Sequence, residues 1–223
     1  MDDDLIAQLR ALDACALSDA LDKLGLSGCV SGLVASTPGV KIAGRVHTVK
    51  LAPGSPPEGS KPRHLGAAAI DASDAGEIIV MEQRTGIEAG SWGGILSRAA
   101  QYHGISGVIA EGLVRDIDEA REIGFPVFSR GFTARTARAR VHEAATDVPV
   151  RVGDITVSPG DYAFADSSAV IFLPADQAAE VVETARMVAA REAEMTRRLA
   201  QGESASDVLG ANYEYMLEAR GDE

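Results

Sequence analysis

The chain has 223 residues, with 33 acidic against 21 basic side chains and a formal net charge of −12 at pH 7. Hydrophobic residues make up 46% and charged residues 24% of the sequence, which is typical of a soluble globular protein and excludes a disordered or fibrous one. The negative charge repels phosphate backbones and anionic lipids, so we expect neither nucleic acid nor a membrane as a partner.

The sequence shows no membrane-spanning segment, no secretory signal and no cysteine motif. No apolar stretch reaches the ~18 residues that a membrane-spanning helix needs, and the opening MDDDLIAQLR is acidic where a secretory signal would be basic. We therefore expect a cytoplasmic protein. Cys15 and Cys29 form no C-x-x-C pair and have no His at ligand spacing, so we expect reduced thiols rather than a disulfide or a zinc site.

The first third of the chain predicts two helices, one strand and a loop. Residues 4–14 and 16–25 carry apolar side chains three and four positions apart, and Gly25 closes the second helix. Residues 41–51 alternate like a strand. The stretch 51–64 is rich in Pro, Gly and Ser, which predicts a surface loop inside one domain.

From Gly66 onward, short apolar strands alternate with helices. Strands are predicted at 76–82, 107–114 and 126–132, and helices at 93–104 and 117–124. This alternation is typical of a parallel sheet buried on both faces.

The last third predicts an antiparallel layer and a long helix. Residues 147–174 contain four short strands separated by turn residues, and an amphipathic helix follows over about 176–199. Such a helix is ~36 Å long, so we expect its far end to pack on another subunit. We predict one α/β domain over residues 1–202 and a polar tail over 203–223.

Two strand-to-helix turns carry the candidate site. Both follow strands of the predicted parallel sheet, and open α/β folds bind ligands at the carboxyl ends of such strands. The first turn, Ser91-Trp92-Gly93-Gly94-Ile95-Leu96, opens a helix. The backbone N–H groups of Gly94, Ile95 and Leu96 therefore have no partner within the helix and can bind a carboxylate.

The second turn ends in Arg115 and Asp116. Arg115 offers a guanidinium for bidentate recognition of an anion. Asp116 offers an oxygen ligand for a divalent cation that keeps several of its waters. A purely structural interpretation is also open: Asp116 and Glu119 form a capping-box pattern, Arg115 and Glu119 can form a surface pair, and Gly93-Gly94 can be a plain turn.

The segment from Trp92 to Gly131 resembles the 4-hydroxy-4-methyl-2-oxoglutarate / 4-carboxy-4-hydroxy-2-oxoadipate aldolase family. The family signature is G-x20-R-D-x2-E/D, and Gly94, twenty intervening residues, Arg115, Asp116 and Glu119 match it. The resemblance covers roughly residues 15 to 200. Relatives of this family include the protein inhibitor of ribonuclease E.

The resemblance implies a swivelling β/β/α domain, a homotrimer or hexamer, and sites between neighbouring subunits. It implies that Asp116 binds Mg²⁺ or Mn²⁺, that Arg115 holds a small 2-oxo acid and its enolate, and that the amides of Gly93 to Leu96 hold the carboxylate. A Glu on the C-terminal helix of the adjacent subunit would orient a metal-bound water. We assign that role to Glu194, with Glu192 second; a helical ion pair with Arg198 is the alternative for Glu194.

The implied activity is metal-dependent retro-aldol cleavage of a 4-hydroxy-2-oxo acid to pyruvate and a second oxo acid, without a Schiff-base lysine. Oxaloacetate decarboxylation passes through the same enolate and is expected as a side activity. The chain departs from the family where a Lys usually follows the R-G segment: it offers Arg135, Arg138 or Arg140 instead. Recognition of the distal carboxylate of the substrate is therefore open.

Other candidates and other functions remain open. The histidines, His47, His64, His103 and His142, lie at no metal-ligand spacing, and Trp92 either walls the pocket or packs in the core. A protein-binding regulator of the ribonuclease E type is the first alternative function, but such regulators typically end near the last strand. A related 2-oxo acid lyase or hydratase is the other alternative. Methyl transfer is set aside, because no G-x-G follows a candidate strand.

Overall fold

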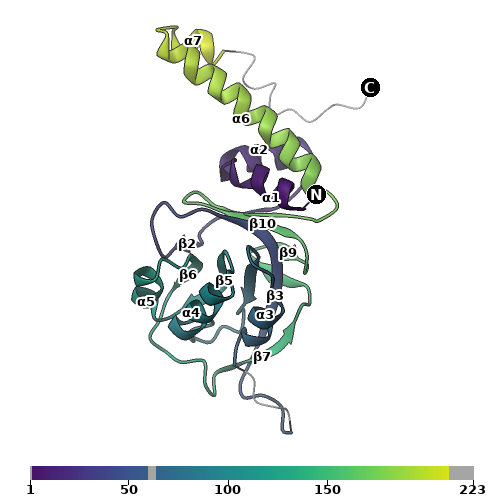
Figure 1. Ribbon diagram of the computed structural model, residues 1–223, viewed down its shortest axis with the longest axis vertical. Coiled ribbons are helices and arrows are strands. Elements are labelled where there is room, and N and C mark those ends of the chain that lie inside the picture. The colour runs from purple at the N-terminus through teal and green to yellow at the C-terminus, as the bar shows by residue number, and fades with distance from the viewer. Residues whose placement is uncertain (1, 60–63, 211–223) are drawn as a thin grey trace.

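Strand β3 (Ile42–Pro53) organises the fold, because it takes part in both halves of one curled sheet (Figure 1). The computed structural model describes residues 2–59 and 64–210. The first half of β3 pairs antiparallel with β10, and its second half pairs parallel with β4 and antiparallel with β7. The sheet order is β1-β11-β10-β3-β4-β5-β6-β2, with β7 beside β3 and a separate β8–β9 hairpin.

The remaining strands fall into three groups. The parallel strands that follow β3 are β4 (Ile78–Glu82), β5 (Gly107–Val114) and β6 (Val127–Phe132). The antiparallel strands are β7 (Val141–Thr146), β8 (Val150–Val152), β9 (Ile155–Val157), β10 (Tyr162–Ala165) and β11 (Val170–Leu173). Two short edge strands are β1 (Cys29–Val30) and β2 (Val34–Ala35). The predicted parallel sheet and antiparallel layer are both confirmed.

The helices are distributed on both sides of this sheet. They are α1 (Asp2–Arg10), α2 (Ala14–Lys23), α3 (Ala67–Ala72), α4 (Gly94–Tyr102), α5 (Ile117–Glu122), α6 (Ala178–Ala200) and α7 (Ala205–Val208). Helix α2 forms as predicted: the Asp13 carboxylate accepts a hydrogen bond from the Ala16 amide at 2.9 Å, and Gly25 ends the helix region at φ 66°. Its apolar face, which includes Leu17 and Leu21, is buried.

The core lies on both faces of the parallel strands. In β4, Ile79 and Met81 pack with Trp92 under the helices α3 and α4, whereas Ile78 and Val80 face the β8–β9 hairpin. Every residue of β4 is buried. The sheet is thus buried on both faces as predicted, although a hairpin rather than a helix covers one of them.

A third cluster joins α1, α2 and α6 to strands β10 and β11. The first half of α6 packs there through Val181, Val182, Ala185 and Val188. From residue 189 to residue 200 no residue of α6 is buried, and Figure 1 shows this half projecting away from the sheet. The helix boundaries agree with the prediction; packing on a second subunit stays a prediction.

Several elements differ from the sequence-based expectations. Strand β3 continues to Pro53 into the predicted loop, because β7 pairs with its end. Strand β7 and helix α3 were not predicted: VHEAAT lacks apolar alternation and AAAIDA is too short for a helical period. Helix α7 lies in the predicted polar tail and buries Val208; the rest of the tail, residues 211–223, lies outside the described residues. None of the helices in the described ranges is both long and apolar enough to cross a membrane.

Candidate active site

The two predicted turns lie side by side. The Ser91 amide and hydroxyl both donate to the Leu113 carbonyl, at 2.8 and 2.9 Å, and the Arg115 amide donates to the Trp92 carbonyl at 2.9 Å. These contacts run the segment before α4 along the end of β5. They bring the turn of residues 93–96 against Arg115 and Asp116, which come from a segment about twenty residues later.

Asp116 turns its carboxylate toward α4 instead of capping its own helix. It occupies the N-cap position of α5 in the left-handed region, at φ 55° and ψ 37°, and makes no side-chain capping bond there. Its Oδ2 accepts the Gly94 amide at 3.2 Å and lies 3.1 Å from Arg115 Nε. The capping-box interpretation is therefore wrong: the carboxylate sits at the N-terminus of α4, where the helix dipole favours negative charge.

Glu119 does not pair with Arg115 as the structural alternative supposed. Its nearest basic partner is Arg98, with Nε to Oε2 at 3.8 Å. The Glu119 carboxylate lies directly over Gly94: a Cβ at Gly94 would be 2.3 Å from Oε2. A Cβ at Gly93 would likewise be 2.9 Å from the Asp116 carboxylate. A side chain at either glycine would therefore have to displace one of these carboxylates, so the pair is more than a plain turn.

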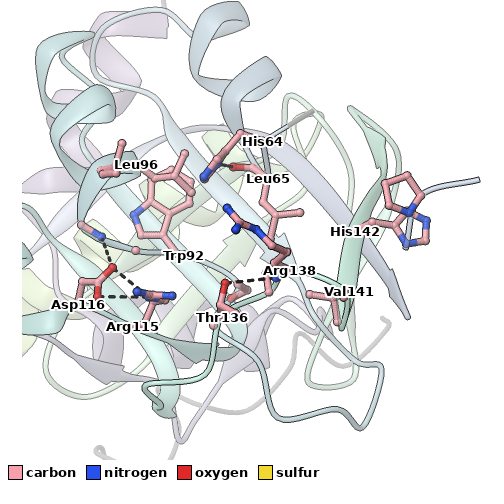
Figure 2. Close-up of a pocket in the computed structure, with 18 residues that line it drawn as sticks. His64, Leu65, Trp92, Leu96, Arg115, Asp116, Thr136, Arg138, Val141 and His142 are labelled. Atoms are coloured by element: carbon pink, nitrogen blue, oxygen red, sulfur yellow. Dashed lines mark hydrogen bonds and ion pairs between the residues drawn. The ribbon is translucent and has the colours of Figure 1, made fainter. Parts of the chain in front are cut away.

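A cavity of about 600 Å³ opens over these groups (Figure 2). The turn of residues 93–96 lies at one end of the cavity, together with Arg115 and Asp116. The first hydrogen bond of α4 runs from the Ser97 amide to the Gly93 carbonyl. The preceding N–H groups of Ile95 and Leu96 therefore have no partner within the helix. The walls are mainly apolar, formed by Leu65, Trp92, Leu96, Ala137 and Val141. Arg138, His64 and His142 also line it.

The cavity is basic within an acidic protein. Asp116 is the one carboxylate among its described lining residues, and it is paired with Arg115. Of the three arginines considered for the family Lys position, Arg138 lines the cavity, and Figure 2 shows its side chain pointing into it. Arg135 is instead 3.3 Å from Glu88, and Arg140 donates to the Thr136 carbonyl. An anion with a second acidic group fits this charge distribution.

The described residues around Asp116 form no closed cation site. Within residues 2–59 and 64–210, no cluster of three or more His, Cys, Asp or Glu side chains has metal-binding geometry. The Asp116 side chain is 33% exposed and lines the cavity. One accessible carboxylate suits Mg²⁺ or Mn²⁺, which leave the other coordination positions to water and substrate.

Glu194 and Glu192 lie away from this cavity in the same chain. Both are on the second half of α6, which projects from the opposite side of the molecule to α4 and α5 (Figure 1). Glu194 pairs with Arg197 at 2.7 Å and not with Arg198, which binds Glu203. The hydrogen bond from Arg197 lowers the pKa of Glu194. Burial raises the pKa of Glu192, and the carboxylates of Asp13 and Asp19 raise it further.

The structure also shows the positions of the remaining candidate residues. Trp92 does both things considered for it, since it is 2% exposed in the core and also lines the cavity. His103 is the C-cap residue of α4. Ser97 and Glu143 were not predicted as site residues, and both hydrogen-bond to the backbone of the cavity wall. Ser97 lies one helical turn after Gly93, a spacing that indicates a hydrogen bond back to the start of the helix.

These features define an RraA-like α/β protein. The family model described as RraA-like, Aldolase/RraA, matches residues 14–172, and the chain belongs to this family. DlpA of Legionella pneumophila is 29% identical over 198 residues, which is 89% of this chain but only 32% of DlpA. The chain thus spans about a third of that relative. A putative 4-hydroxy-4-methyl-2-oxoglutarate aldolase of Halalkalibacterium halodurans is 27% identical over 82% of both chains.

Solved structures share the fold. A protein from Pseudomonas syringae pv. tomato aligns with a TM-score of 0.83 and 30% identity, covering 93% of this chain and 98% of its own. Streptomyces coelicolor RraAS2, described as an unusual member of the RNase ES inhibitor RraA family, aligns with a TM-score of 0.75 and 24% identity over 91% of this chain and 98% of its own. The swivelling α/β fold with a long C-terminal helix is thereby confirmed.

Proposed function

We propose that this protein is a divalent-metal-dependent aldolase. It cleaves a 4-hydroxy-2-oxo acid, such as 4-hydroxy-4-methyl-2-oxoglutarate or 4-carboxy-4-hydroxy-2-oxoadipate, to pyruvate and a second oxo acid. The observation that carries the proposal is the meeting of the α4 N-terminus, Arg115 and Asp116 at one end of a basic cavity. The aldolase name of the Halalkalibacterium relative supports the reaction class.

The 2-oxo acid end of the substrate binds at this end of the cavity. The amides of Ile95 and Leu96 hold its carboxylate, because they have no partner within the helix, whereas the Gly94 amide already donates to Asp116. Asp116 engages Arg115 through Nε, so the two Nη groups remain to bind the keto oxygen. When the C3–C4 bond breaks, its electron pair forms the enolate of pyruvate, and Arg115 compensates the negative charge that develops on that oxygen. Asp116 would hold a Mg²⁺ or Mn²⁺ ion, and this ion would supply Lewis-acid stabilisation of the same charge.

Cleavage also requires a base for the C4 hydroxyl proton. Asp116 already accepts hydrogen bonds from Arg115 and Gly94, and no other described lining residue is a carboxylate. We propose that a water molecule in the site takes this proton and that Glu194 of a neighbouring copy, with Glu192 second, orients this water in a homotrimer or hexamer. The projection of α6 away from its own sheet supports this assignment (Figure 1).

Arg138 takes the place of the family Lys in this proposal. Its guanidinium lies in the cavity with Arg115, and we propose that it binds the second carboxylate of the substrate. Oxaloacetate yields the same enolate on loss of CO₂, so decarboxylation is the expected side activity.

A ribonuclease regulator is the second candidate. RraAS2 is described as belonging to the RNase ES inhibitor family and aligns over nearly its whole chain, so continuation of this chain beyond the last strand does not by itself separate the two functions. Retention of a ribonuclease by an Asp116→Ala variant on an affinity column, together with inactivity of the wild type as a lyase, would favour the regulator.

The test is pyruvate release. Purified protein is incubated with 4-hydroxy-4-methyl-2-oxoglutarate or oxaloacetate, with Mg²⁺ or with EDTA, and pyruvate is followed with lactate dehydrogenase. We expect Mg²⁺-dependent release that Arg115→Ala and Asp116→Ala abolish. Arg135→Ala is the matched control, because Arg135 pairs with Glu88 outside the cavity lining. Full activity in either site variant would contradict the proposal.

A further inference from the structure

A buried hydroxyl ties the cavity wall to the start of α4. The indole Nε1 of Trp92 donates to Ser97 Oγ at 3.0 Å, and Ser97 Oγ donates to the Gly93 carbonyl at 3.1 Å. Trp92 and Ser97 are 2% and 1% exposed. Because the hydroxyl both accepts and donates, the orientation of the ring and the position of the Gly93 peptide depend on the same oxygen atom.

The other edge of the ring is held by Gly66. This residue adopts φ 73°, and a Cβ there would lie 2.9 Å from Trp92 Cζ3, so no larger residue fits without displacing the ring. The Gly66 amide donates to Glu143 Oε2 at 2.7 Å, and Thr146 donates to the other carboxylate oxygen of Glu143 at 2.7 Å. Glu143 on β7 thus fixes the backbone that packs on the indole.

The main chain of Trp92 reaches the second half of the site. Its carbonyl accepts the Arg115 amide at 2.9 Å. A shift of Trp92 therefore moves both the carboxylate-binding turn and the residue that holds the keto oxygen. The two turns are separated by about twenty residues, and Trp92 contacts both.

We propose that Ser97 and Glu143 are positioning residues that hold Trp92, and through it the α4 turn and Arg115, in the arrangement that binds a 2-oxo acid. This inference rests on the proposed function. Neither residue belongs to the sequence signature matched above, and Ser97 does not line the cavity. Displacing a bound group by about 1 Å costs on the order of 10²-fold in rate, so loss of the Ser97 hydroxyl has its effect on catalysis even though the hydroxyl is out of reach of the substrate.

The experiment uses Trp92 itself as the probe. It is the single Trp of the chain, so its fluorescence reports the cavity directly. We titrate wild type, Ser97→Ala and Ser97→Thr with oxalate, a stable analogue of the pyruvate enolate, in the presence of Mg²⁺, and measure kcat and KM for oxaloacetate. Ser73→Ala is the matched control: Ser73 is also buried and donates to the carbonyl four residues before it, but at the C-terminal end of α3.

We expect Ser97→Ala to bind oxalate at least tenfold more weakly and to lose at least tenfold in kcat/KM, with Ser97→Thr recovering most of both and Ser73→Ala changing neither. Glu143→Ala should resemble Ser97→Ala. Trp92→Phe and Ser97→Ala should be non-additive in a double-mutant cycle of kcat/KM, because both remove the same hydrogen bond. Additive losses would overturn the inference. This test does not depend on Ser97→Thr and applies even if that variant does not fold.

The inference and the proposed function fail differently. Equal oxalate affinity and equal kcat/KM in wild type and Ser97→Ala, with only the melting temperature lowered, would overturn the inference and leave the aldolase proposal intact. Oxalate binding that depends on Ser97 without any pyruvate release by the wild type would support the positioning role and overturn the aldolase proposal.

Discussion

Replacing Asp116 by Asn should separate activity from stability. The substitution keeps the size of the side chain and an oxygen that can accept the Gly94 amide, but removes the negative charge that faces Arg115 Nε at 3.1 Å. The same charge is the one that would hold a divalent cation. If Asp116 is only a helix cap, this change should lower stability. If Asp116 is a catalytic carboxylate, the change should lower activity.

The expected loss of stability is small. The side chains of Arg115 and Asp116 are 35% and 33% exposed, and an exposed ion pair contributes about 0.2–1 kcal/mol. For a chain of this size, 1 kcal/mol corresponds to a change of about 2–4 °C in Tm. We therefore expect Asp116→Asn to melt no more than about 4 °C below the wild type.

The expected loss of activity is large. Asp116 is the residue that would hold the divalent cation, and a neutral Asn is a much weaker cation ligand. Loss of one electrostatic contact that stabilises a developing oxyanion, here the one the cation would supply, costs about 10²–10³ in kcat. Activity is measured as coupled pyruvate release and stability by circular dichroism. Asp118→Asn is the control, because Asp118 is 92% exposed and pairs with Arg121. A fall of more than 10 °C in Tm with kcat retained would show that Asp116 is a structural cap and refute the reasoning.

Three further predictions concern the surroundings of the site. Gly94→Ala should keep the fold but lower kcat/KM, measured by the same assay, because its Cβ must displace the half-exposed Glu119 carboxylate 2.3 Å away; unchanged kcat/KM would count against the close approach. Glu111→Ala should lower the free energy of unfolding in urea by about 1.5–3 kcal/mol, since the partly buried Glu111 carboxylate accepts from Arg130 and from the Gly153 amide; a loss below that of an exposed pair would show the contact to be unimportant. Glu192→Gln should raise Tm at pH 7, because burial and nearby carboxylates raise the pKa of Glu192 above 4.5 and make its negative charge unfavourable in the folded state. This charge is present above the raised pKa and is lost below pH 4.5. A gain in Tm that persists at pH 4 would contradict this cause.

The sequence predicted what local patterns determine. Strands β4, β5 and β6 each begin with a buried apolar run, which predicts neighbouring parallel strands. The carboxyl ends of such strands lie at one edge of the sheet, and this brings the two turns together. Strand β7 escaped prediction because VHEAAT has no apolar alternation and forms by pairing with the end of β3, more than eighty residues away in sequence.

The site shows the same division between local and distant contacts. The capping-box pattern at Asp116 describes the helix that follows, whereas the left-handed backbone at φ 55° turns the carboxylate toward α4. No local spacing records that contact. The hydrogen bond between Trp92 and Ser97 was not predicted for a related reason. The sequence shows Ser97 only as a polar residue within a helix, and the position of the indole becomes known only from the folded structure.

The central claim is that Arg115, Asp116 and the α4 turn stabilise a pyruvate enolate, and it is tested most directly by proton exchange. Pyruvate is incubated with the protein and Mg²⁺ in D₂O, and the methyl signal is followed by proton NMR. The account predicts Mg²⁺-dependent loss of the methyl signal as deuterium enters, abolished in Arg115→Ala and Asp116→Asn and independent of which second oxo acid the enzyme normally releases. Exchange no faster than in protein-free buffer, in a sample whose fluorescence shows that pyruvate is bound, would contradict it.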